Sequence, residues 1–442
     1  MVGRTAGANA VSQPGIGPPK ISVVIPTHDR SEALSRLLMA LRDQTSAADD
    51  FEVVVVADGC QDETVTKIRN QHWPFRVRML EQPASGAATA RNRGAEHASG
   101  DVLLFLDDDV EPDPDLLRAH LALHAEHEAV VGLGSLRPVI RQDSLFGVTI
   151  RGWWEEMSAP VRELGHRYSC FDLLSGHFSI RRQDFKALGG FDSTLRCRED
   201  YELGYRVSAA GLAYRLVTGA EARHHETSNL AKVIRRKLDE GIADVGLCER
   251  HPALADALPL RRKPIGSRLT PLLHWLAWHQ PAIGDALAWC VTSTLPFYEF
   301  WRLRYRWRVR IEDLLSYWYW RGVATATGSR VRLTALLAKR ADERDACVTI
   351  DLGAGLEAAE AQLDRLRPVS IRLVYGEHFI GELKEAPGAE PLRGIHLRRI
   401  IMRQFADEYL RAVILSRAVP GILLNPALEQ ALSSKSPSIT PR

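Results

Sequence analysis

Short apolar runs alternate with helical segments in the first part of the chain, and this alternation restricts the possible folds more than any other feature. Residues 21–26 ("ISVVIP"), 51–59 ("FEVVVVADG") and 101–109 ("DVLLFLDDD") are nearly continuous apolar runs. Residues 30–44 lie between the first two and carry leucines at the spacing of an amphipathic helix. Strands that are apolar on both faces and connected by helices predict a Rossmann-like α/β fold, a mostly parallel sheet with helices on both faces.

The composition of the chain changes after about residue 250, which divides it into regions. Seven of the ten tryptophans lie between Trp275 and Trp320, and strand-like and helical stretches follow one another again beyond Gly328. The predicted organisation is a disordered tail over 1–19, an α/β domain over 20–250, a helical, Trp- and Arg-rich segment over 251–335, a small α+β accessory domain over 336–430 and a disordered tail over 431–442.

Charge and cysteine usage exclude several classes of protein. The net charge of +2 produces no overall field that would attract nucleic acid or a membrane. The six cysteines are scattered without a C-x-x-C pair, which argues against a disulfide framework or a zinc site and for a reducing, cytoplasmic location. The first 20 residues lack the apolar core of a signal peptide, and no run of 18 uncharged apolar residues predicts a transmembrane helix.

Three consecutive aspartates end the third apolar run, where like charges repel one another. In an extended chain Asp107 and Asp109 point to one side and Asp108 to the other. Two carboxylates on one side, at the C-terminal end of a strand, form a hard oxygen site for Mg²⁺ or Mn²⁺ with room for substrate phosphates. The alternative is that aspartates cap the next helix. We favour capping for Asp113 and Asp115, because "DPDLLRAH" is typical of a helix start.

Six motifs follow one another over residues 20–230: "ISVVIPTHDR", "VVVVADGCQDET", "SGAATARNRG", "VLLFLDDDVEP", "LGGFD" and "REDYELGYR". In their order and spacing they resemble family-two glycosyltransferases. These are inverting enzymes of the GT-A fold, the nucleotide-diphospho-sugar transferase fold, and they use nucleotide-sugar donors. The resemblance covers about half of the chain and implies a glycosyltransferase of the hexosyltransferase type.

The resemblance implies roles for five residues around the donor. Asp109, in the family's D-x-D motif, would ligate a divalent metal, Mn²⁺ or Mg²⁺, that bridges the diphosphate, and Asp107 would contact the ribose, the metal or both. Thr27 and Asp29 in "PTHDR" would contact the nucleoside, although Asp29 also suits a helix cap. Asp58 in "VVADG" would accept a hydrogen bond from the base, which favours a UDP- or dTDP-sugar. The alternative for Asp58 is a turn residue in an Asp-Gly pair.

Four further residues complete the site that the resemblance implies. Arg91 in "ATARNRG" would face the diphosphate, with which a guanidinium forms charge-assisted hydrogen bonds. Asp200 in "REDYELGYR" would be the general base that takes a proton from the acceptor hydroxyl, and Glu199 would support it. The alternative is that both acids only stabilise a helix N-terminus. His224 lies where many relatives place a metal-binding histidine. We favour it over its neighbour His225, and the alternative for both is a structural histidine.

Arginines alternate with aromatic and aliphatic residues at the start of "FWRLRYRWRVRIEDLLSYWYWRG" (300–322). The alternation is that of a strand, but the flanking residues favour a helix, which we predict. Three interpretations stay open for this segment. It could pack on the α/β domain, contact anionic lipids peripherally at the inner face of a membrane, or bind nucleic acid, and we favour the first two.

The sequence thus predicts a metal-dependent inverting glycosyltransferase in cell-surface polysaccharide synthesis. Its donor would be a nucleotide-diphosphate sugar, and its acceptor a hydroxyl of a glycan or a lipid-linked glycan. One alternative is a nucleotidyltransferase on a similar α/β fold, although "PTHDRSEA" lacks the Gly-rich basic loop expected after the first strand. Another is a catalytically inactive scaffold of the same fold. No nucleic-acid partner is expected, and the donor sugar, the linkage and the oligomeric state stay open.

Overall fold

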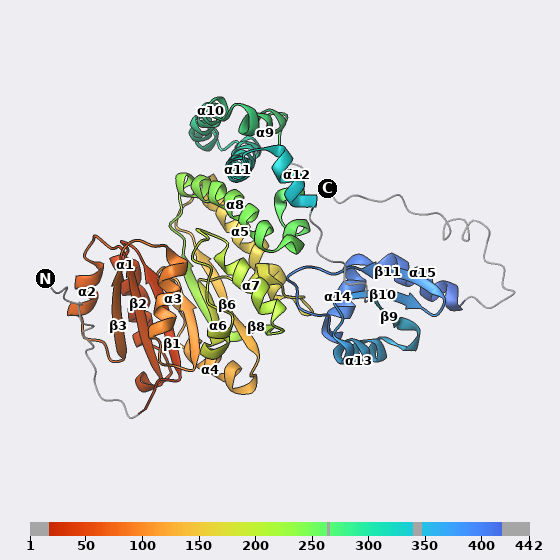
Figure 1. The fold of residues 1–442 in the computed structure, drawn as a ribbon, viewed down its shortest axis with the longest axis horizontal. Coiled ribbons are helices and arrows are strands. Elements are labelled where there is room, and N and C mark those ends of the chain that lie inside the picture. Colours follow the sequence, from red (N-terminus) through yellow and green to blue (C-terminus); the bar gives the residue numbers. More distant parts are fainter. Residues whose placement is uncertain (1–16, 263–265, 339–346, 418–442) are drawn as a thin grey trace. The chain divides into compact units, whose positions relative to one another are not determined.

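The computed structural model describes residues 17–262, 266–338 and 347–417, which form two compact units (Figure 1). The first unit holds the residues up to Arg162, Tyr168–Asp342 and Pro387–Ala389, and the second holds Glu163–Arg167, Glu343–Ala386 and the residues from Glu390 on. The two predicted disordered tails lie outside the described residues, except for residues 17–19.

An eight-stranded sheet forms the centre of the first unit, with the strand order β3-β2-β1-β4-β7-β6-β8-β5. Its strands are β1 (Ile21–Thr27), β2 (Phe51–Asp58), β3 (Arg76–Gln82), β4 (Val102–Leu106), β5 (Val110–Pro112), β6 (Val130–Val139), β7 (His177–Arg181) and β8 (Ala213–His225). The strands β3, β2, β1 and β4 run parallel, as do β6 and β8. Only β7 and β5 run antiparallel to their partners. The mostly parallel sheet confirms the predicted α/β class.

Helices cover both faces of the sheet, because alternate residues of the central strands enter two different cores. Ile21 and Val23 of β1 pack with α1, whereas Val24 packs with α3. The helices of this part are α1 (Ser31–Arg42), α2 (Thr64–Asn70), α3 (Ala87–His97), α4 (Leu116–Glu126), α5 (Leu145–Arg162), α6 (Arg182–Ala187) and α7 (Glu199–Ala209).

One edge of the sheet collects the ends of three apolar strands. The strands β1, β2 and β4 are buried over their whole length and end in Thr27, Asp58 and Leu106. Because these strands are parallel, their C-terminal ends meet at the same edge, which is where open α/β sheets bind ligands.

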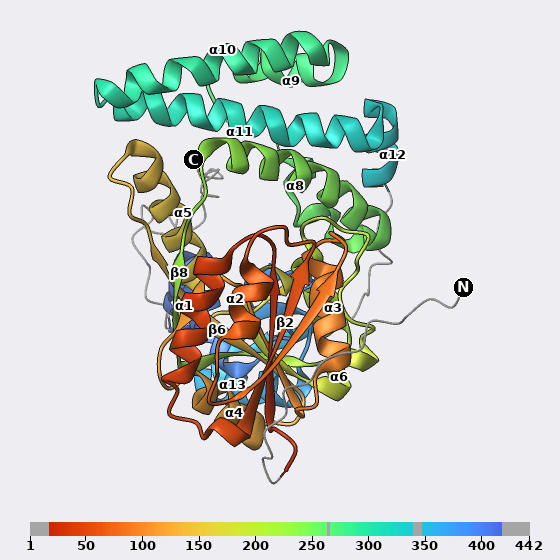
Figure 2. The ribbon, with the colours of Figure 1, turned by 90° about the vertical axis from the view of Figure 1, so that its left-hand side faces the viewer.

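The described part of the first unit also contains five α-helices after the sheet: α8 (Leu230–Arg250), α9 (Thr270–His279), α10 (Pro281–Phe300), α11 (Arg304–Thr327) and α12 (Arg330–Ala338). Figure 2 shows α10 and α11 side by side, with α8 next to α11. The helices α8 and α11 approach closely at two glycines, Gly241 and Gly322, where a side chain would collide with the opposite backbone. The helix predicted over 300–322 is confirmed from Arg304 on, whereas residues 301–303, with Arg302 among them, connect α10 to α11. In the described ranges no helix combines the length and the apolar character needed to cross a membrane.

The second unit is small and contains a three-stranded sheet with the order β11-β10-β9. Its elements are β9 (Cys347–Asp351), α13 (Leu356–Leu366), β10 (Ser370–Tyr375), β11 (His378–Leu383), α14 (Gly394–Gln404) and α15 (Ala406–Arg417). Helices α13 and α14 pack on the sheet around Leu363 and Leu397, so the unit has a core of its own. This is the α+β arrangement that the sequence predicts.

Candidate active site

The three aspartates lie in a tight turn rather than at the end of an extended strand. The strand β4 ends at Leu106, and the N–H of Val110 donates a hydrogen bond to the carbonyl of Asp107 at 3.1 Å. The N–H of Asp107 donates to the carbonyl of Gly176 at 3.2 Å. The expectation that the aspartate side chains alternate as in an extended chain was therefore wrong, because a four-residue turn sets their directions.

Arg30 supplies the positive charge that the consecutive aspartates need. Its Nη1 donates to Oδ1 of Asp108 at 2.9 Å and to Oδ2 of Asp109 at 2.8 Å. Thr27 donates its hydroxyl to the other oxygen of Asp108 at 2.8 Å. Burial raises the pKa of Asp108 to about 6, although Arg30 opposes this shift. Both oxygens of Asp108 are thus bound within the protein, and Thr27 helps to hold the turn.

Asp109 faces His224 across the pairing of β5 with β8. Nε2 of His224 lies 3.4 Å from Oδ1 of Asp109, and the ring of Trp154, on α5, has its centre 4.7 Å from that of His224. Burial raises the pKa of Asp109, but His224 and Arg30 outweigh it, and the net pKa lies below the usual value. Burial lowers the pKa of His224, but Asp109 outweighs it, and the net pKa is raised. Each partner therefore favours the charged form of the other.

Each of these two residues has one polar side-chain atom without a hydrogen-bond partner among the described residues. Oδ1 of Asp109 and Nδ1 of His224 are buried, and neither forms a hydrogen bond with the part of the chain that the structure describes. His225 instead pairs with Glu111 on β5 at 2.6 Å. Carboxylate oxygen suits Mg²⁺ and Mn²⁺, and imidazole suits transition metals, so the chemistry of these side chains is compatible with a divalent metal. It is Nε2 rather than Nδ1 of His224 that faces Asp109, and the metal site stays a prediction.

Arg91 connects the aspartate turn to the acidic motif. Arg91 is 3% exposed, and its Nη2 donates to Oδ1 of Asp107 at 2.6 Å while its Nη1 donates to Oε1 of Glu199 at 2.9 Å. Burial raises the pKa of Glu199, and so does Asp200, whereas Arg91 opposes the shift. The structure therefore shows Arg91 between two carboxylates. Its predicted contact with a diphosphate stays a prediction.

Asp200 lies in the first turn of α7 and points to a different partner than Glu199. Its Oδ1 accepts a hydrogen bond from the N–H of Tyr201 at 2.9 Å, and its Oδ2 lies 3.5 Å from the N–H of Ser175. Ser175 precedes Gly176, whose carbonyl binds the aspartate turn. Burial raises the pKa of Asp200, although Arg198 and Arg91 oppose the shift. A raised pKa brings a carboxylate closer to what a general base needs near neutral pH.

Asp58 holds the loop between β3 and α3. Its Oδ1 accepts from the N–H of Ser85 at 2.7 Å and from the side chain of Gln82 at 2.8 Å, and its Oδ2 accepts from the N–H of Gly86 at 2.8 Å. Position 86 requires glycine, because its φ of 93° is unfavourable for residues that carry a side chain. The predicted contact of Asp58 with the base stays a prediction, and its observed contacts are those of a loop anchor.

Asp29 connects the loop after β1 to the loop after β2. Its Oδ1 accepts from the N–H groups of Gln61 and Asp62 at 2.7 and 3.1 Å, and its own φ is 51°. It forms no side-chain cap on α1, which begins after Arg30. Among the described residues Asp29, Cys60 and Asp62 also bring three potential metal donors within 4.8 Å of one another. Two of the three are exposed acids, and burial raises the pKa of the Cys60 thiol, which disfavours the thiolate.

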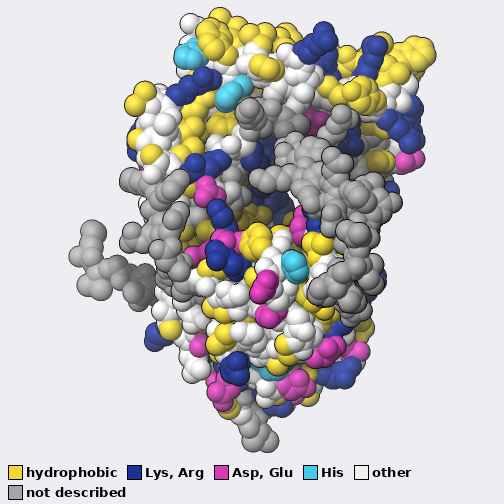
Figure 3. Space-filling model, turned by 90° about the vertical axis from the view of Figure 1, so that its right-hand side faces the viewer, with side chains coloured by type: hydrophobic (Ala, Val, Ile, Leu, Met, Phe, Trp, Pro, Cys, Tyr) yellow, Lys and Arg dark blue, Asp and Glu magenta, His cyan; other side chains and the backbone are white. Residues whose placement is uncertain are grey.

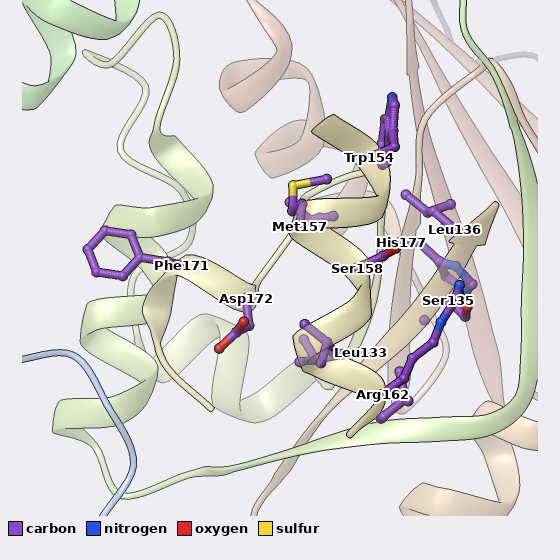
Figure 4. Close-up of a pocket in the computed structure, with 14 residues that line it drawn as sticks. Leu133, Ser135, Leu136, Trp154, Met157, Ser158, Arg162, Phe171, Asp172 and His177 are labelled. Atoms are coloured by element: carbon purple, nitrogen blue, oxygen red, sulfur yellow. Dashed lines mark hydrogen bonds between the residues drawn. The ribbon is translucent and has the colours of Figure 1, made fainter. Parts of the chain in front are cut away.

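A cavity of about 50 Å³ lies beside Trp154, between β6, α5, the short helix Cys170–Asp172 and β7 (Figure 4). Figure 4 shows the side chains of α5, among them Met157 and Arg162, next to those of β6. Nη2 of Arg162 donates to the hydroxyl of Ser135 at 2.9 Å across this space. Pockets for small molecules measure roughly 300–1,000 Å³. The cavity is thus too small for a nucleotide.

Two residues of this site are missing from the sequence-based prediction. Arg30 comes shortly after the first strand and pairs with two of the three adjacent aspartates. Because three adjacent carboxylates need a nearby cation, the sequence contained a signal for such a residue at this sheet edge. Trp154 lies on a helix with no motif, and no signal in the sequence indicates its contact with His224.

The chain is similar to known proteins over this region. A family model described as "Glycosyl transferase family 2" matches residues 22–189. Validoxylamine A glucosyltransferase of Streptomyces hygroscopicus subsp. jinggangensis (strain 5008) is 32% identical over 308 residues, which are 60% of this chain and 70% of that protein. The O-antigen biosynthesis protein RfbC of Myxococcus xanthus is 32% identical over 236 residues, which are 50% of this chain and 18% of that protein.

The comparison with solved structures gives matches of low score. Mannosyltransferase PcManGT from Pyrobaculum calidifontis, in complex with GDP-Man and Mn²⁺, is 17% identical, with a TM-score of 0.42 over 71% of this chain and 89% of that one. At that score nothing about the chemistry of the present chain follows from the likeness.

Proposed function

The chain belongs to glycosyl transferase family 2, and on that premise we propose an inverting, metal-dependent sugar transfer. The donor is a nucleotide-diphosphate sugar, preferably of UDP or dTDP, and the acceptor is a hydroxyl of a glycan or a lipid-linked glycan. The observation that carries this proposal is the position of Arg91, which holds Asp107 and Glu199 at 2.6 and 2.9 Å. Two motifs that are far apart in the sequence thereby share one buried cation.

Asp200 is the proposed general base. An inverting transfer in a single displacement needs one group to take the proton from the acceptor hydroxyl, and it needs no covalent enzyme nucleophile. Burial raises the pKa of Asp200 against Arg198 and Arg91, which suits this task. Glu199 is held by Arg91, so it supports the site through position rather than by proton transfer.

Asp109, Asp107 and His224 are the residues that would hold the metal. When bound, a divalent cation would offset the charge of the departing nucleoside diphosphate. Arg30 holds Asp109 and Thr27 holds Asp108, so these two carboxylates are positioned before any ligand arrives. The proposed nucleoside contacts are Thr27, Asp29 and Asp58, whose loops meet at the same sheet edge.

We propose that the protein acts in the synthesis of a surface polysaccharide, and the name of the Myxococcus relative supports this proposal. The proposed location is the cytoplasm, and the six cysteines, which form no disulfide among the described residues, are consistent with it.

Nucleotide binding tests the proposal directly. We would measure the thermal unfolding midpoint with UDP, dTDP, GDP and CDP, each with and without Mn²⁺. UDP or dTDP should raise the midpoint only when Mn²⁺ is present, since only a ligand that binds the folded state stabilises it. Asp109→Asn should abolish the shift, whereas the control Asp115→Asn, which changes a half-buried acid directly before α4, should keep it.

Two outcomes would decide for the alternatives. No shift with any nucleotide would support an inactive scaffold. Release of pyrophosphate from a nucleoside triphosphate and a sugar phosphate would support a nucleotidyltransferase.

A further inference from the structure

The turn between α10 and α11 and the helix ends that flank it, residues 297–306, expose large aromatic side chains. Phe300 and Tyr305 are 78% and 80% exposed, and Trp301 and Phe297 are 60% and 57% exposed. Such side chains offer 150–250 Å² of mostly apolar surface each, and contiguous exposed apolar surface marks an interaction site. Figure 3 shows hydrophobic side chains with Lys and Arg among them over α9–α11, at the top of the view.

The apolar surface continues along α10. Trp289, Phe297 and Phe300 follow one another at intervals of eight and three residues, so they lie on one face of the helix. Trp289 is 70% exposed, and α10 contains no Lys or Arg at all. The two acids of α10 have partners, since Asp285 pairs with Arg321 at 3.3 Å and Glu299 accepts from the N–H of Leu145. The exposed rings therefore lie beside a cationic end.

Three arginines form that cationic end. Arg302, Arg304 and Arg306 are exposed, and no carboxylate of the described residues lies in ion-pair contact with them. The next two arginines along α11 behave differently, since Arg308 pairs with Glu312 at 2.8 Å and Arg310 pairs with an aspartate at 3.1 Å. The unpaired charges thus coincide with the exposed aromatic rings.

The turn is held in place by the helices beneath it. The N–H of Leu303 donates to the carbonyl of Tyr298 at 2.9 Å, and Trp307 is buried at the start of α11. Glu299 accepts a hydrogen bond from the N–H of Leu145, the first residue of α5, at 2.8 Å. The exposed rings therefore project from a fixed support.

An anionic lipid surface matches this combination better than other partners do. Trp and Tyr favour the boundary between headgroups and acyl chains, and arginine binds lipid phosphate. Single-stranded nucleic acid is bound in basic grooves that follow its backbone. The stripe on α10 carries no basic residue and lies on a convex helix face, so it offers such a strand no path.

We propose that residues 297–306, together with Trp289, dock the protein on an anionic membrane surface. The aromatic rings enter the headgroup region, and the three arginines bind lipid phosphates. This inference goes beyond the proposed transfer reaction and does not depend on it. Glu299 of the docking segment contacts Leu145, the first residue of α5. Trp154, which lies beside His224, follows nine residues later on the same helix, about 14 Å from Leu145. A lipid-linked acceptor would thus meet the site from the docked side.

Vesicle flotation with the full chain tests the proposal. Vesicles of phosphatidylcholine and phosphatidylglycerol in equal parts should retain the protein, and pure phosphatidylcholine vesicles should not. Replacing the three arginines together, as Arg302→Gln, Arg304→Gln and Arg306→Gln, should weaken binding roughly 100-fold, as expected for three cations near an anionic surface. The pair Phe300→Ser and Trp301→Ser should weaken it as well.

Two controls separate docking from general charge and hydrophobicity. Arg308→Gln removes an arginine that is already paired, and Phe379→Ser removes an aromatic ring that is 62% exposed in the second unit. Both controls should bind vesicles like the unmodified chain. All four changes are at exposed positions, and unchanged thermal unfolding would show that the fold is intact.

Three results would overturn the proposal. The first is that the unmodified chain floats with neither kind of vesicle. The second is that the aromatic and arginine variants bind as tightly as the controls. The third is that light scattering shows a dimer which the aromatic variant dissociates, because the face would then join two copies of the chain.

Discussion

The hydroxyl of Tyr319, on α11, donates a hydrogen bond to Oδ2 of Asp244, on α8, at 2.9 Å. The other oxygen of Asp244 lies 3.3 Å from Nε of Arg198, which also contacts Glu240 at 3.2 Å. Arg198 directly precedes α7 and has a φ of 66°, a conformation that few non-glycine residues adopt. A buried line of contacts thus runs from the helical region to the first turn of α7, where Asp200 lies.

Removal of the Tyr319 hydroxyl should destabilise the first unit more than removal of a matched hydroxyl on the same helix. In Tyr319→Phe the buried carboxylate of Asp244 loses a donor, which costs about 2 kcal/mol. In Tyr317→Phe the carboxylate of Asp285 loses a hydrogen bond of 2.5 Å, but its side chain is 38% exposed and water can replace the donor. Circular dichroism should show the lower unfolding midpoint for Tyr319→Phe, and equal midpoints would contradict the prediction.

Replacement of Arg198 should change the pH dependence of the proposed reaction. Arg198 lowers the pKa of Asp200 against the effect of burial. Its loss should raise that pKa and move the acid limb of the kcat/KM profile upward by about 1 pH unit. Arg198→Asn is the suitable change, because asparagine tolerates the left-handed backbone.

The matched control for this change is Arg206→Asn. Arg206 lies on α7 and pairs with Glu202, and it is not among the main charges that shift the pKa of Asp200. It should leave the position of the acid limb unchanged, even if it lowers stability. An identical shift in both variants would show that the effect is structural.

The sheet edge could be predicted from the sequence because it depends on pattern alone. Three apolar runs predicted three buried strands, and parallel strands bring the motifs after them to one edge. Thr27, Asp58 and Asp107 are accordingly found at or directly after the ends of β1, β2 and β4. The helix at 304–327 could also be distinguished from a strand. The residues next to the alternating arginines have the spacing of a helix, and this was stronger evidence than the short alternation itself.

The partners of each side chain could not be predicted, because they depend on loop conformations. The turn at 107–110 forms where the chain reverses into β5, and the carbonyl of Gly176 binds it from a distant loop. Asp29 reaches the N–H groups of Gln61 and Asp62 through a left-handed φ, which no sequence motif specifies. Such contacts decide whether an aspartate binds a ligand or a loop.

A methyl group at Gly176 should lower activity without unfolding the protein. A Cβ at this position would lie 2.7 Å from Oδ2 of Asp107, and Arg91 fixes the other oxygen of that carboxylate. Asp107 would have to move, and a displacement of this kind costs about 100-fold in rate. Gly152→Ala is the control, because a Cβ there meets no atom within 4 Å and alanine favours the interior of α5. Donor turnover should fall for Gly176→Ala alone, and equal turnover would refute the steric argument.

Three buried histidines should make the first unit less stable as the pH falls below about 6.5. His120 and His124 each place a ring nitrogen 2.8 Å from the hydroxyl of Ser179, and Nε2 of His120 lies 3.1 Å from Nε2 of His177. Burial lowers the pKa of His124 to about 4 and that of His177 to about 3, and it lowers the pKa of His120 well below its ordinary value. The folded chain therefore keeps these rings neutral under conditions in which the unfolded chain protonates them.

The sign of the effect follows from proton binding. Between pH 6.5 and about 4 the unfolded state binds a proton at His124 that the folded state does not, so stability falls with falling pH by about 1.4 kcal/mol per unit. Asp108, with a pKa of about 6 against 3.8, acts in the opposite direction because its folded form takes the proton first. His124→Gln isolates one histidine, since glutamine keeps a polar group near Ser179 but does not titrate. Its unfolding midpoint should fall less steeply than that of the unmodified chain between about pH 7.5 and about pH 5. Parallel curves would mean that His124 is protonated in the folded state and that its burial does not lower its pKa.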